Sequence, residues 1–90
     1  MSLRVLLVDD EPLARQRLAR LLAEYDNYQV VAEAGNGQAA LDWLRQHKAD
    51  LVLLDIQMPG LTGLEVAEQL MAELPAETPR PAIIFCTAYD

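Results

Sequence analysis

The 90-residue sequence has little cysteine, few basic side chains and no long apolar run. Cys86 is the only cysteine, so no disulfide can form within the chain, and a reducing compartment is the simpler interpretation. Seven Lys and Arg stand against fourteen Asp and Glu, and the formal net charge of −7 argues against a nucleic-acid-binding surface. No apolar run approaches the roughly 20 residues that cross a bilayer, and no signal-peptide pattern follows Arg4. We therefore expect a cytoplasmic protein.

The length and the apolar content favour one small packed domain. Ninety residues are enough for one domain and too few for two. Apolar residues make up 52% of the chain, which argues against a disordered tail and favours a packed core. We expect residues 1–90 to belong to a single domain.

The chain contains four short apolar runs, and each is predicted to be a strand. The runs are bounded by acids, turn residues or prolines, and the first and third run straight into aspartate. The four predicted strands are Leu3–Val8, Gln29–Ala34, Leu51–Leu54 and Ala82–Thr87.

The stretch after the first strand has the apolar spacing of a helix. Pro12 suits the first helical turn, where its missing N–H is not needed. The helix is predicted to end near Asp26–Asn27, with Arg15, Arg17 and Arg20 pointing largely outward.

Two further helices are predicted between the remaining strands. One follows the turn Gly35–Gly37, and the other begins at Thr62, where Thr62 and Glu65 form a capping-box pattern. The chain therefore alternates β-α-β-α-β-α-β, which produces a parallel sheet with helices on both faces.

Acidic residues follow two of the predicted strands, where open parallel sheets bind their ligands. If the first and third strands are neighbours, Asp9, Asp10 and Asp55 converge on one small volume. Two like charges about 4 Å apart repel by roughly 4 kcal/mol at an effective dielectric near 20. Either one carboxylate holds a proton, or a divalent cation lies among them. An all-oxygen site with room for water suits Mg²⁺, with Mn²⁺ as a substitute.

The simpler interpretation of any one of these acids is a turn former or a helix cap. Two acidic clusters at the ends of two buried strands favour a functional site. A nucleotide-binding domain is disfavoured, because it needs a glycine-rich phosphate loop where this chain has Asp9–Glu11.

Three blocks of sequence closely resemble the receiver domains of two-component response regulators. They are Val8–Pro12, Leu53–Gly63 and Cys86–Ala88, and the resemblance covers essentially the whole chain. The ending Ile84–Asp90 resembles more specifically the LytTR-type, alginate-regulator-like branch.

The resemblance implies a flavodoxin-like (CheY-like) doubly wound parallel sheet of order 2-1-3-4. It also implies that the receiver domain is truncated at Asp90, before the last helix, strand and helix. The lysine that receivers carry at the end of the fifth strand would then be missing. Lys48, the only lysine present, is expected at the opposite edge of the sheet from the acids.

By the same resemblance, Asp55 is the phosphoacceptor, which takes a phosphoryl group from the phosphohistidine of a sensor histidine kinase. Asp10 and Asp55 would bind Mg²⁺ through their side chains, and Gln57 through its backbone carbonyl. Asp9 would act through a metal-bound water or a hydrogen bond.

Two residues at the end of the fourth strand complete the implied site. Thr87 would be the switch hydroxyl that bonds a phosphoryl oxygen, and the small side chain of Ala88 would leave the phosphoryl group room to approach. Such a domain is not an enzyme beyond its own phosphorylation and dephosphorylation. It would control an output domain outside this chain that binds DNA.

Two alternative functions remain to be weighed, and the sequence also predicts self-association. A phosphatase of the haloacid dehalogenase type needs a second acid two residues after the nucleophile, and this chain has Gln57 there. A receiver-like scaffold that binds partners without phosphorylation is the better rival, although it commonly loses pocket acids that this chain retains. An uncovered fourth strand with Ile83, Ile84 and Phe85 invites self-association.

Overall fold

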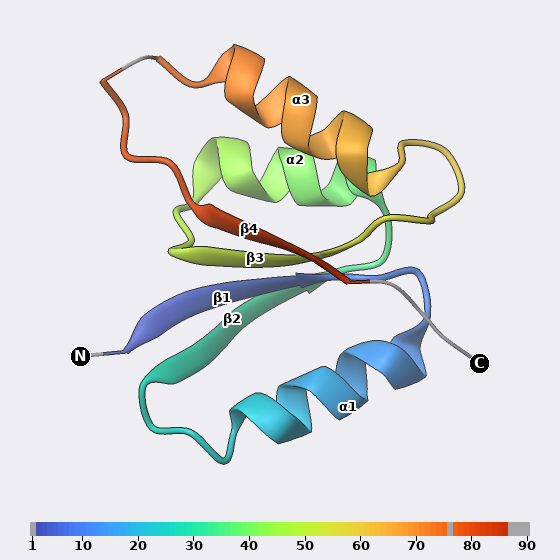
Figure 1. Cartoon of the computed structure of the whole chain (residues 1–90), viewed down its shortest axis with the longest axis vertical. Coiled ribbons are helices and arrows are strands. Elements are labelled where there is room, and N and C mark those ends of the chain that lie inside the picture. Colours follow the sequence, from blue (N-terminus) through green and yellow to red (C-terminus); the bar gives the residue numbers. More distant parts are fainter. Residues whose placement is uncertain (1, 76, 87–90) are drawn as a thin grey trace.

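The computed structural model describes residues 2–75 and 77–86, and within them a four-stranded parallel sheet lies between two layers of helices (Figure 1). The strand order is β2-β1-β3-β4, so the predicted order 2-1-3-4 is confirmed. The elements are β1 (Leu3–Val8), α1 (Pro12–Leu22), β2 (Tyr28–Ala34), α2 (Gly37–Gln46), β3 (Leu51–Asp55), α3 (Gly63–Glu73) and β4 (Ala82–Cys86).

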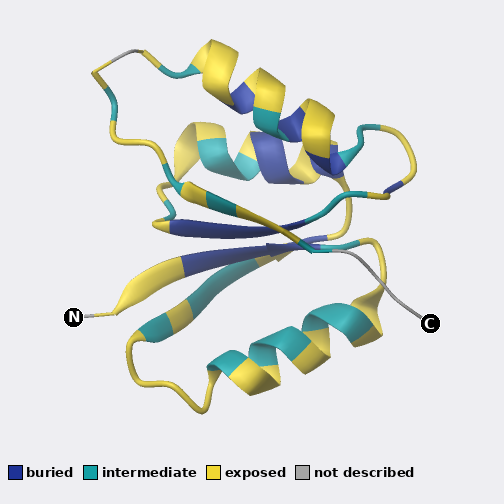
Figure 2. Cartoon of the chain, in the orientation of Figure 1, coloured by how far each residue is buried: buried dark blue, intermediate teal, exposed yellow. Residues whose placement is uncertain are grey.

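The two central strands, β1 and β3, are buried on both faces (Figure 2). Successive side chains of a strand point to opposite faces, so a continuous apolar run supplies two cores at once. The sheet residues facing α2 and α3 include Leu6, Val8, Val52 and Leu54. Those facing α1 are Val5, Leu7, Leu51 and Leu53. Each fully buried side chain of this kind stabilises the fold by about 1.5–3 kcal/mol.

The register of the sheet brings three strand ends to the same level. Val8, the last residue of β1, pairs with Ala34 on one side and with Leu54 on the other. The Asp9 N–H continues this ladder by donating to the Ala34 carbonyl at 3.1 Å. The residues that follow β1 and β3 therefore leave the sheet next to each other.

Helix α1 is shorter than the sequence predicted. It ends at Leu22, and the prediction of an end near Asp26–Asn27 was wrong. The N–H groups of Glu24 and Tyr25 donate to the carbonyls three residues before them, at 3.2 and 3.0 Å. This is the tighter 3₁₀ pattern, and it ends the α-helix. The chain turns here because it must return to the start of β2.

Helix α3 begins with the predicted capping box, which is confirmed. The Glu65 N–H donates to Thr62 Oγ1 at 3.2 Å, and the Thr62 N–H donates to Glu65 Oε1 at 3.0 Å. Two backbone donors of the first turn are thus satisfied. Strand β4 begins at Ala82 as predicted, while its predicted last residue, Thr87, lies outside the described residues.

Gly63 allows the loop after β3 to fold back onto that strand. Its N–H donates to the Ile56 carbonyl at 3.0 Å. A Cβ atom at position 63 would overlap the main-chain oxygen of Asp55. The start of α3 therefore packs directly on the backbone of the last β3 residue.

We expect Gly63→Ala to lower the free energy of unfolding by about 1–3 kcal/mol, because the added methyl group meets backbone that cannot yield easily. Gly35→Ala is the matched control, since the nearest atom to its added Cβ, Arg15 Nη1, lies at 3.4 Å. Urea denaturation of both variants measures the difference. Equal midpoints for the two variants would contradict this packing argument.

Candidate metal centre

Three carboxylates converge at the carboxyl edge of the sheet, as the sequence predicted. Asp9 and Asp10 follow β1, and Asp55 is the last residue of β3. One oxygen from each of the three lies within 4.8 Å of the others. The convergence follows from the parallel pairing of β1 with β3, which ends both strands at the same level.

Two of the three acids also form local turns. Asp9 Oδ1 accepts from the Glu11 N–H at 2.9 Å, and Asp55 Oδ1 accepts from the Gln57 N–H at 3.1 Å. In each of these two carboxylates only Oδ1 takes part in the turn, and Oδ2 does not. The hydrogen bonds within residues 2–75 and 77–86 include none to the Asp10 carboxylate. The turn-forming role and a ligand role are therefore compatible.

The fold disfavours the charged form of the Asp55 side chain. Partial burial raises its pKa above the ordinary value, and the negative charges of Asp9, Asp10 and Glu11 raise it further. The hydrogen bond from the Gln57 N–H opposes this rise in pKa without cancelling it. The ionised cluster thus favours a neutralising cation.

The donor set fits a small hard cation. All three side chains offer carboxylate oxygens close enough to share one ion. Asp10 is exposed and Asp9 and Asp55 are partly exposed, so water can complete the coordination. Mg²⁺ in proteins usually binds a few protein oxygens and keeps water in the remaining coordination positions.

Arg15 reaches the same edge, and the prediction that it points outward with Arg17 and Arg20 was wrong. Its Nη1 donates to the Asp9 carbonyl at 2.6 Å, and its Nε pairs with Glu33 at 3.1 Å. A long side chain in the first helical turn points back toward the helix N-terminus, and here that direction leads to the end of β1. This directional rule is the signal that could have located Arg15.

Cys86 lies beside Asp55 in the register of β3 and β4. Burial raises the pKa of its thiol, and the nearby charges of Asp55 and Asp9 raise it further. A thiol in this setting is a weak nucleophile at neutral pH. The next two predicted site residues, Thr87 and Ala88, lie outside the described residues.

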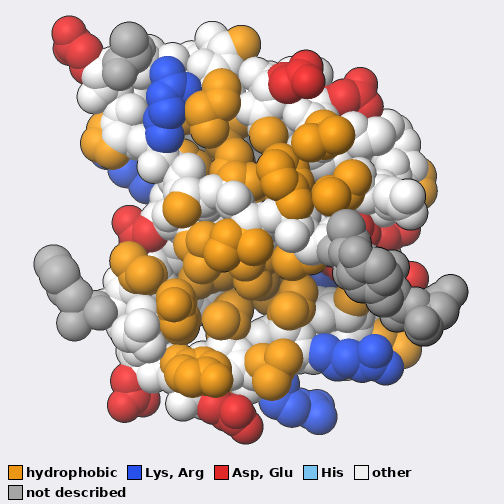
Figure 3. All heavy atoms as spheres, in the orientation of Figure 1, with side chains coloured by type: hydrophobic (Ala, Val, Ile, Leu, Met, Phe, Trp, Pro, Cys, Tyr) orange, Lys and Arg blue, Asp and Glu red, His pale blue; other side chains and the backbone are white. Residues whose placement is uncertain are grey.

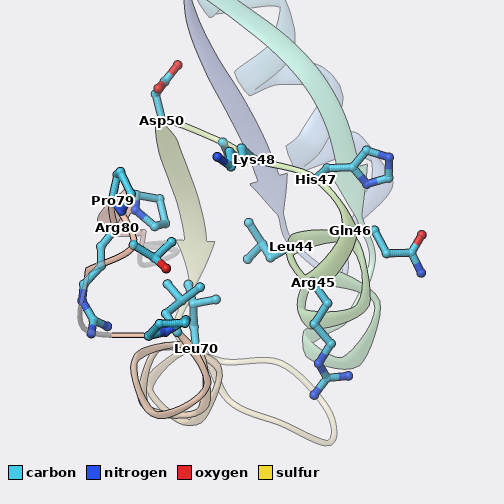
Figure 4. A pocket seen from close by; sticks show the side chains of 14 residues that line it. Leu44, Arg45, Gln46, His47, Lys48, Asp50, Leu70, Pro79 and Arg80 are labelled. Atoms are coloured by element: carbon cyan, nitrogen blue, oxygen red, sulfur yellow. The ribbon is translucent and has the colours of Figure 1, made fainter.

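A cavity of about 360 Å³ opens at the opposite edge of the sheet, around the end of α2 and the start of β3 (Figure 4). Lys48 lines it, as expected for a lysine remote from the acids. Arg45 and Arg80 line it too, but Arg45 is paired with Glu73 at 2.7 Å and Arg80 donates to the Met71 carbonyl at 3.1 Å. Arg45 is thus neutralised by an acid and Arg80 is tied to the backbone, so the acidic cluster is the stronger candidate site.

The 2-1-3-4 parallel sheet and the three carboxylates at its carboxyl edge define an α/β domain with an acidic edge that could hold a cation. The chain belongs to the response regulator receiver domain family, which it matches over residues 5–90. It is thus the receiver domain of a two-component response regulator, a class that works with histidine kinases and output domains.

Several named relatives are similar over nearly the whole chain. The positive alginate biosynthesis regulatory protein of Pseudomonas aeruginosa is 55% identical over 98% of this chain. The transcriptional regulatory protein BtsR of Salmonella typhi is 42% identical, also over 98%. The chain spans 34% and 35% of these two proteins, about a third of their length.

Solved structures agree with this assignment. The response regulator TrrA of Thermotoga maritima, in complex with Mg²⁺-BeF, superposes with a TM-score of 0.83 at 42% identity, over 99% of this chain and 71% of that one. The signal receiver domain of the response regulator NarL from Mycobacterium tuberculosis gives a TM-score of 0.84 at 37% identity, over 99% and 68%. None of the helices in the described part of this chain has the length and apolar character that a membrane crossing requires.

The raised pKa of Asp55 predicts a pH-dependent stability change in Asp55→Asn. The folded state binds the Asp55 proton more tightly than the unfolded state does, so this residue favours folding at low pH and opposes it once pH rises through its folded pKa. Without divalent cations at neutral pH, we expect Asp55→Asn to melt a few degrees higher than the parent.

This gain should vanish at a pH below the unfolded pKa of Asp55, where both chains are neutral at position 55. Melting curves in EDTA, followed by circular dichroism, measure it. Glu68→Gln is the control, because it removes one exposed acid of α3 without touching the cluster. A parent and an Asp55→Asn variant with equal melting temperatures at neutral pH would refute the electrostatic argument.

Proposed function

We propose that this receiver accepts a phosphoryl group on Asp55, from the phosphohistidine of a sensor histidine kinase, in a Mg²⁺-dependent reaction. The observation that carries the proposal is the convergence of Asp9, Asp10 and Asp55 within 4.8 Å at the carboxyl edge of the sheet. The complex of TrrA with Mg²⁺-BeF, a relative at 42% identity, supports the choice of ion. Mn²⁺ is the expected substitute.

The side chain of Asp55 is suited to act as the nucleophile. Its Oδ1 is held by the Gln57 N–H at 3.1 Å, which orients the carboxylate and leaves Oδ2 to attack. An Oδ2–P bond forms as the P–N bond of the phosphohistidine breaks, and the departing imidazole nitrogen keeps the electron pair and takes a proton from water. A bound cation would supply positive charge beside the phosphoryl oxygens.

The ligand roles follow from the positions of the acids. Asp10 and Asp55 would bind the cation through their carboxylates, and Gln57 through its main-chain oxygen. Asp9, whose Oδ1 already accepts from the Glu11 N–H, would act through a metal-bound water or a hydrogen bond. The roles of Thr87 and Ala88 stay predictions. The Thr87 hydroxyl would bond a phosphoryl oxygen, and the small Ala88 side chain would leave space for the phosphoryl group.

The protein as a whole is proposed to be a cytoplasmic transcription regulator of the LytTR-type branch. The 55% identity to the positive alginate biosynthesis regulatory protein supports this branch. Residues 1–90 would form the first part of its receiver domain, and a DNA-binding output domain would follow. The chain's coverage of the two solved receivers, 68% and 71% of their lengths, is compatible with this division.

Phosphorylation of Asp55 is tested with Mg²⁺ and acetyl phosphate, followed by intact-mass spectrometry. We expect one phosphoryl addition in the parent, none in Asp55→Asn and none in EDTA, because the acceptor and the cation are both required. Glu68→Gln serves as the control for removal of an unrelated carboxylate. Addition to Asp55→Asn would place the acceptor elsewhere.

If the parent chain takes up no phosphoryl group, a chain extended through a fifth strand is tested in the same way. Phosphorylation of the longer chain alone would show that residues outside 1–90 are needed to complete the acceptor site. Failure of both chains would favour a scaffold that binds partners without phosphorylation.

We also propose that this chain self-associates through the outer edge of β4. Within the described residues, β4 pairs only with β3, and Ile84 and Phe85 are 51% and 39% exposed. Figure 3 shows apolar side chains gathered on the face of the molecule that includes β4. A strand edge with exposed apolar side chains is a template for pairing with a second chain.

Light scattering at rising concentration is expected to show a dimer that Ile84→Lys converts to a monomer. Leu64→Lys is the matched control, because Leu64 is 52% exposed but lies on α3, away from β4. A monomeric parent at high concentration would rule out this mode of association.

A further inference from the structure

Arg15 is a basic side chain held against the acidic edge of the sheet. Its guanidinium donates to the Asp9 carbonyl at 2.6 Å and pairs with Glu33 of β2 at 3.1 Å. The side chain is only 19% exposed, unlike a solvated surface arginine. Within residues 2–75 and 77–86, the hydrogen bonds place no other Lys or Arg on the segment Asp9–Glu11.

The backbone of Asp9 is consequently fixed on both sides. Its N–H donates to the Ala34 carbonyl at 3.1 Å, and its carbonyl accepts from Arg15. Its carboxylate in turn holds the Glu11 N–H at 2.9 Å. Asp10 lies between these two fixed residues, and its own carboxylate accepts no hydrogen bond from the described residues. The direction of the Asp10 carboxylate thus depends on the backbone that Arg15 holds.

We propose that Arg15 is a positioning residue for the cation site: its bond to the Asp9 carbonyl sets the turn that aims Asp10 at Asp55. The inference rests on the proposed Mg²⁺-dependent function. Arg15 touches neither the cation nor the phosphoryl group in this role. It acts through the main chain, in the way that outer hydrogen-bond partners orient metal ligands elsewhere.

Two physical effects of Arg15 on cation binding have opposite signs. Its positive charge repels a cation, so its removal would tighten binding if charge alone mattered. Its hydrogen bond orders the turn, so its removal loosens binding if orientation dominates. Glu33 pairs with the guanidinium and offsets much of its charge, which leaves orientation as the larger effect. The direction of the change in Mg²⁺ affinity therefore distinguishes the two.

The test is a titration of the chain with Mg²⁺ alone, followed through backbone amide shifts by NMR. We expect Arg15→Ala to raise the dissociation constant about tenfold, the lower end of the range for outer partners of metal ligands. Arg15→Lys keeps the charge and one donor, so its affinity should lie between those of Arg15→Ala and the parent. Arg17→Ala, at an exposed position of the same helix, should match the parent.

Equal or tighter Mg²⁺ binding by Arg15→Ala would overturn the inference and leave the proposed function intact. Arg15→Lys binding as tightly as the parent would do the same, since the two-bond geometry would then be dispensable. A parent that binds no Mg²⁺ would overturn the proposed function, and this inference with it. Circular dichroism of each variant establishes that it is folded, and if Arg15→Ala is not, the comparison of Arg15→Lys with the parent decides.

Discussion

The parallel pairing of β1 with β3 is the constraint on which the site depends. It ends both strands at one level and so brings Asp9, Asp10 and Asp55 together despite their like charges. The repulsion is tolerated because the two strands are buried on both faces, and their apolar side chains stabilise the sheet far more than the acids destabilise it. The same repulsion makes the edge receptive to a cation, since binding removes an existing penalty.

The two faces of this sheet are covered unequally. Helices α2 and α3 enclose one face, and the core there includes buried residues from both helices. On the other face only α1 packs within the described residues, and its contacts with the sheet come from half-buried side chains. The loop from Asp55 to Gly63 leads into α3 on the better-covered face, and Gly63 packs against the Asp55 backbone there.

Much of the fold could be predicted from the sequence because the decisive signals are local. Buried strands are short apolar runs, and the capping box at Thr62 and Glu65 uses residues three apart. The adjacency of β1 and β3 is not local, and it came from the resemblance of three sequence blocks to receiver domains. The end of α1 was predicted too late, because the helical pattern alone does not show where the chain must turn back to the sheet.

The acidic residues of the candidate site were predicted from the sequence, but its one basic residue, Arg15, was missed. Asp9, Asp10 and Asp55 stand out because acids directly after apolar runs are uncommon in a packed core. Arg15 looks like its neighbours Arg17 and Arg20 on a polar helix face, and only the direction of its side chain sets it apart. Contacts made by a long side chain across two elements depend on where those elements lie, which a pattern within one helix does not encode.

The parallel sheet also has a consequence for folding kinetics. Val5 pairs with Leu51, just over half the chain away, and every strand pair in the described sheet is joined by a connection that contains a helix. Such non-local pairings form slowly, because the entropy of closing long loops opposes them before any contact is gained. The acidic cluster cannot exist until β1 and β3 have paired. We therefore expect the three carboxylates to come together only late in folding, after the helices have formed.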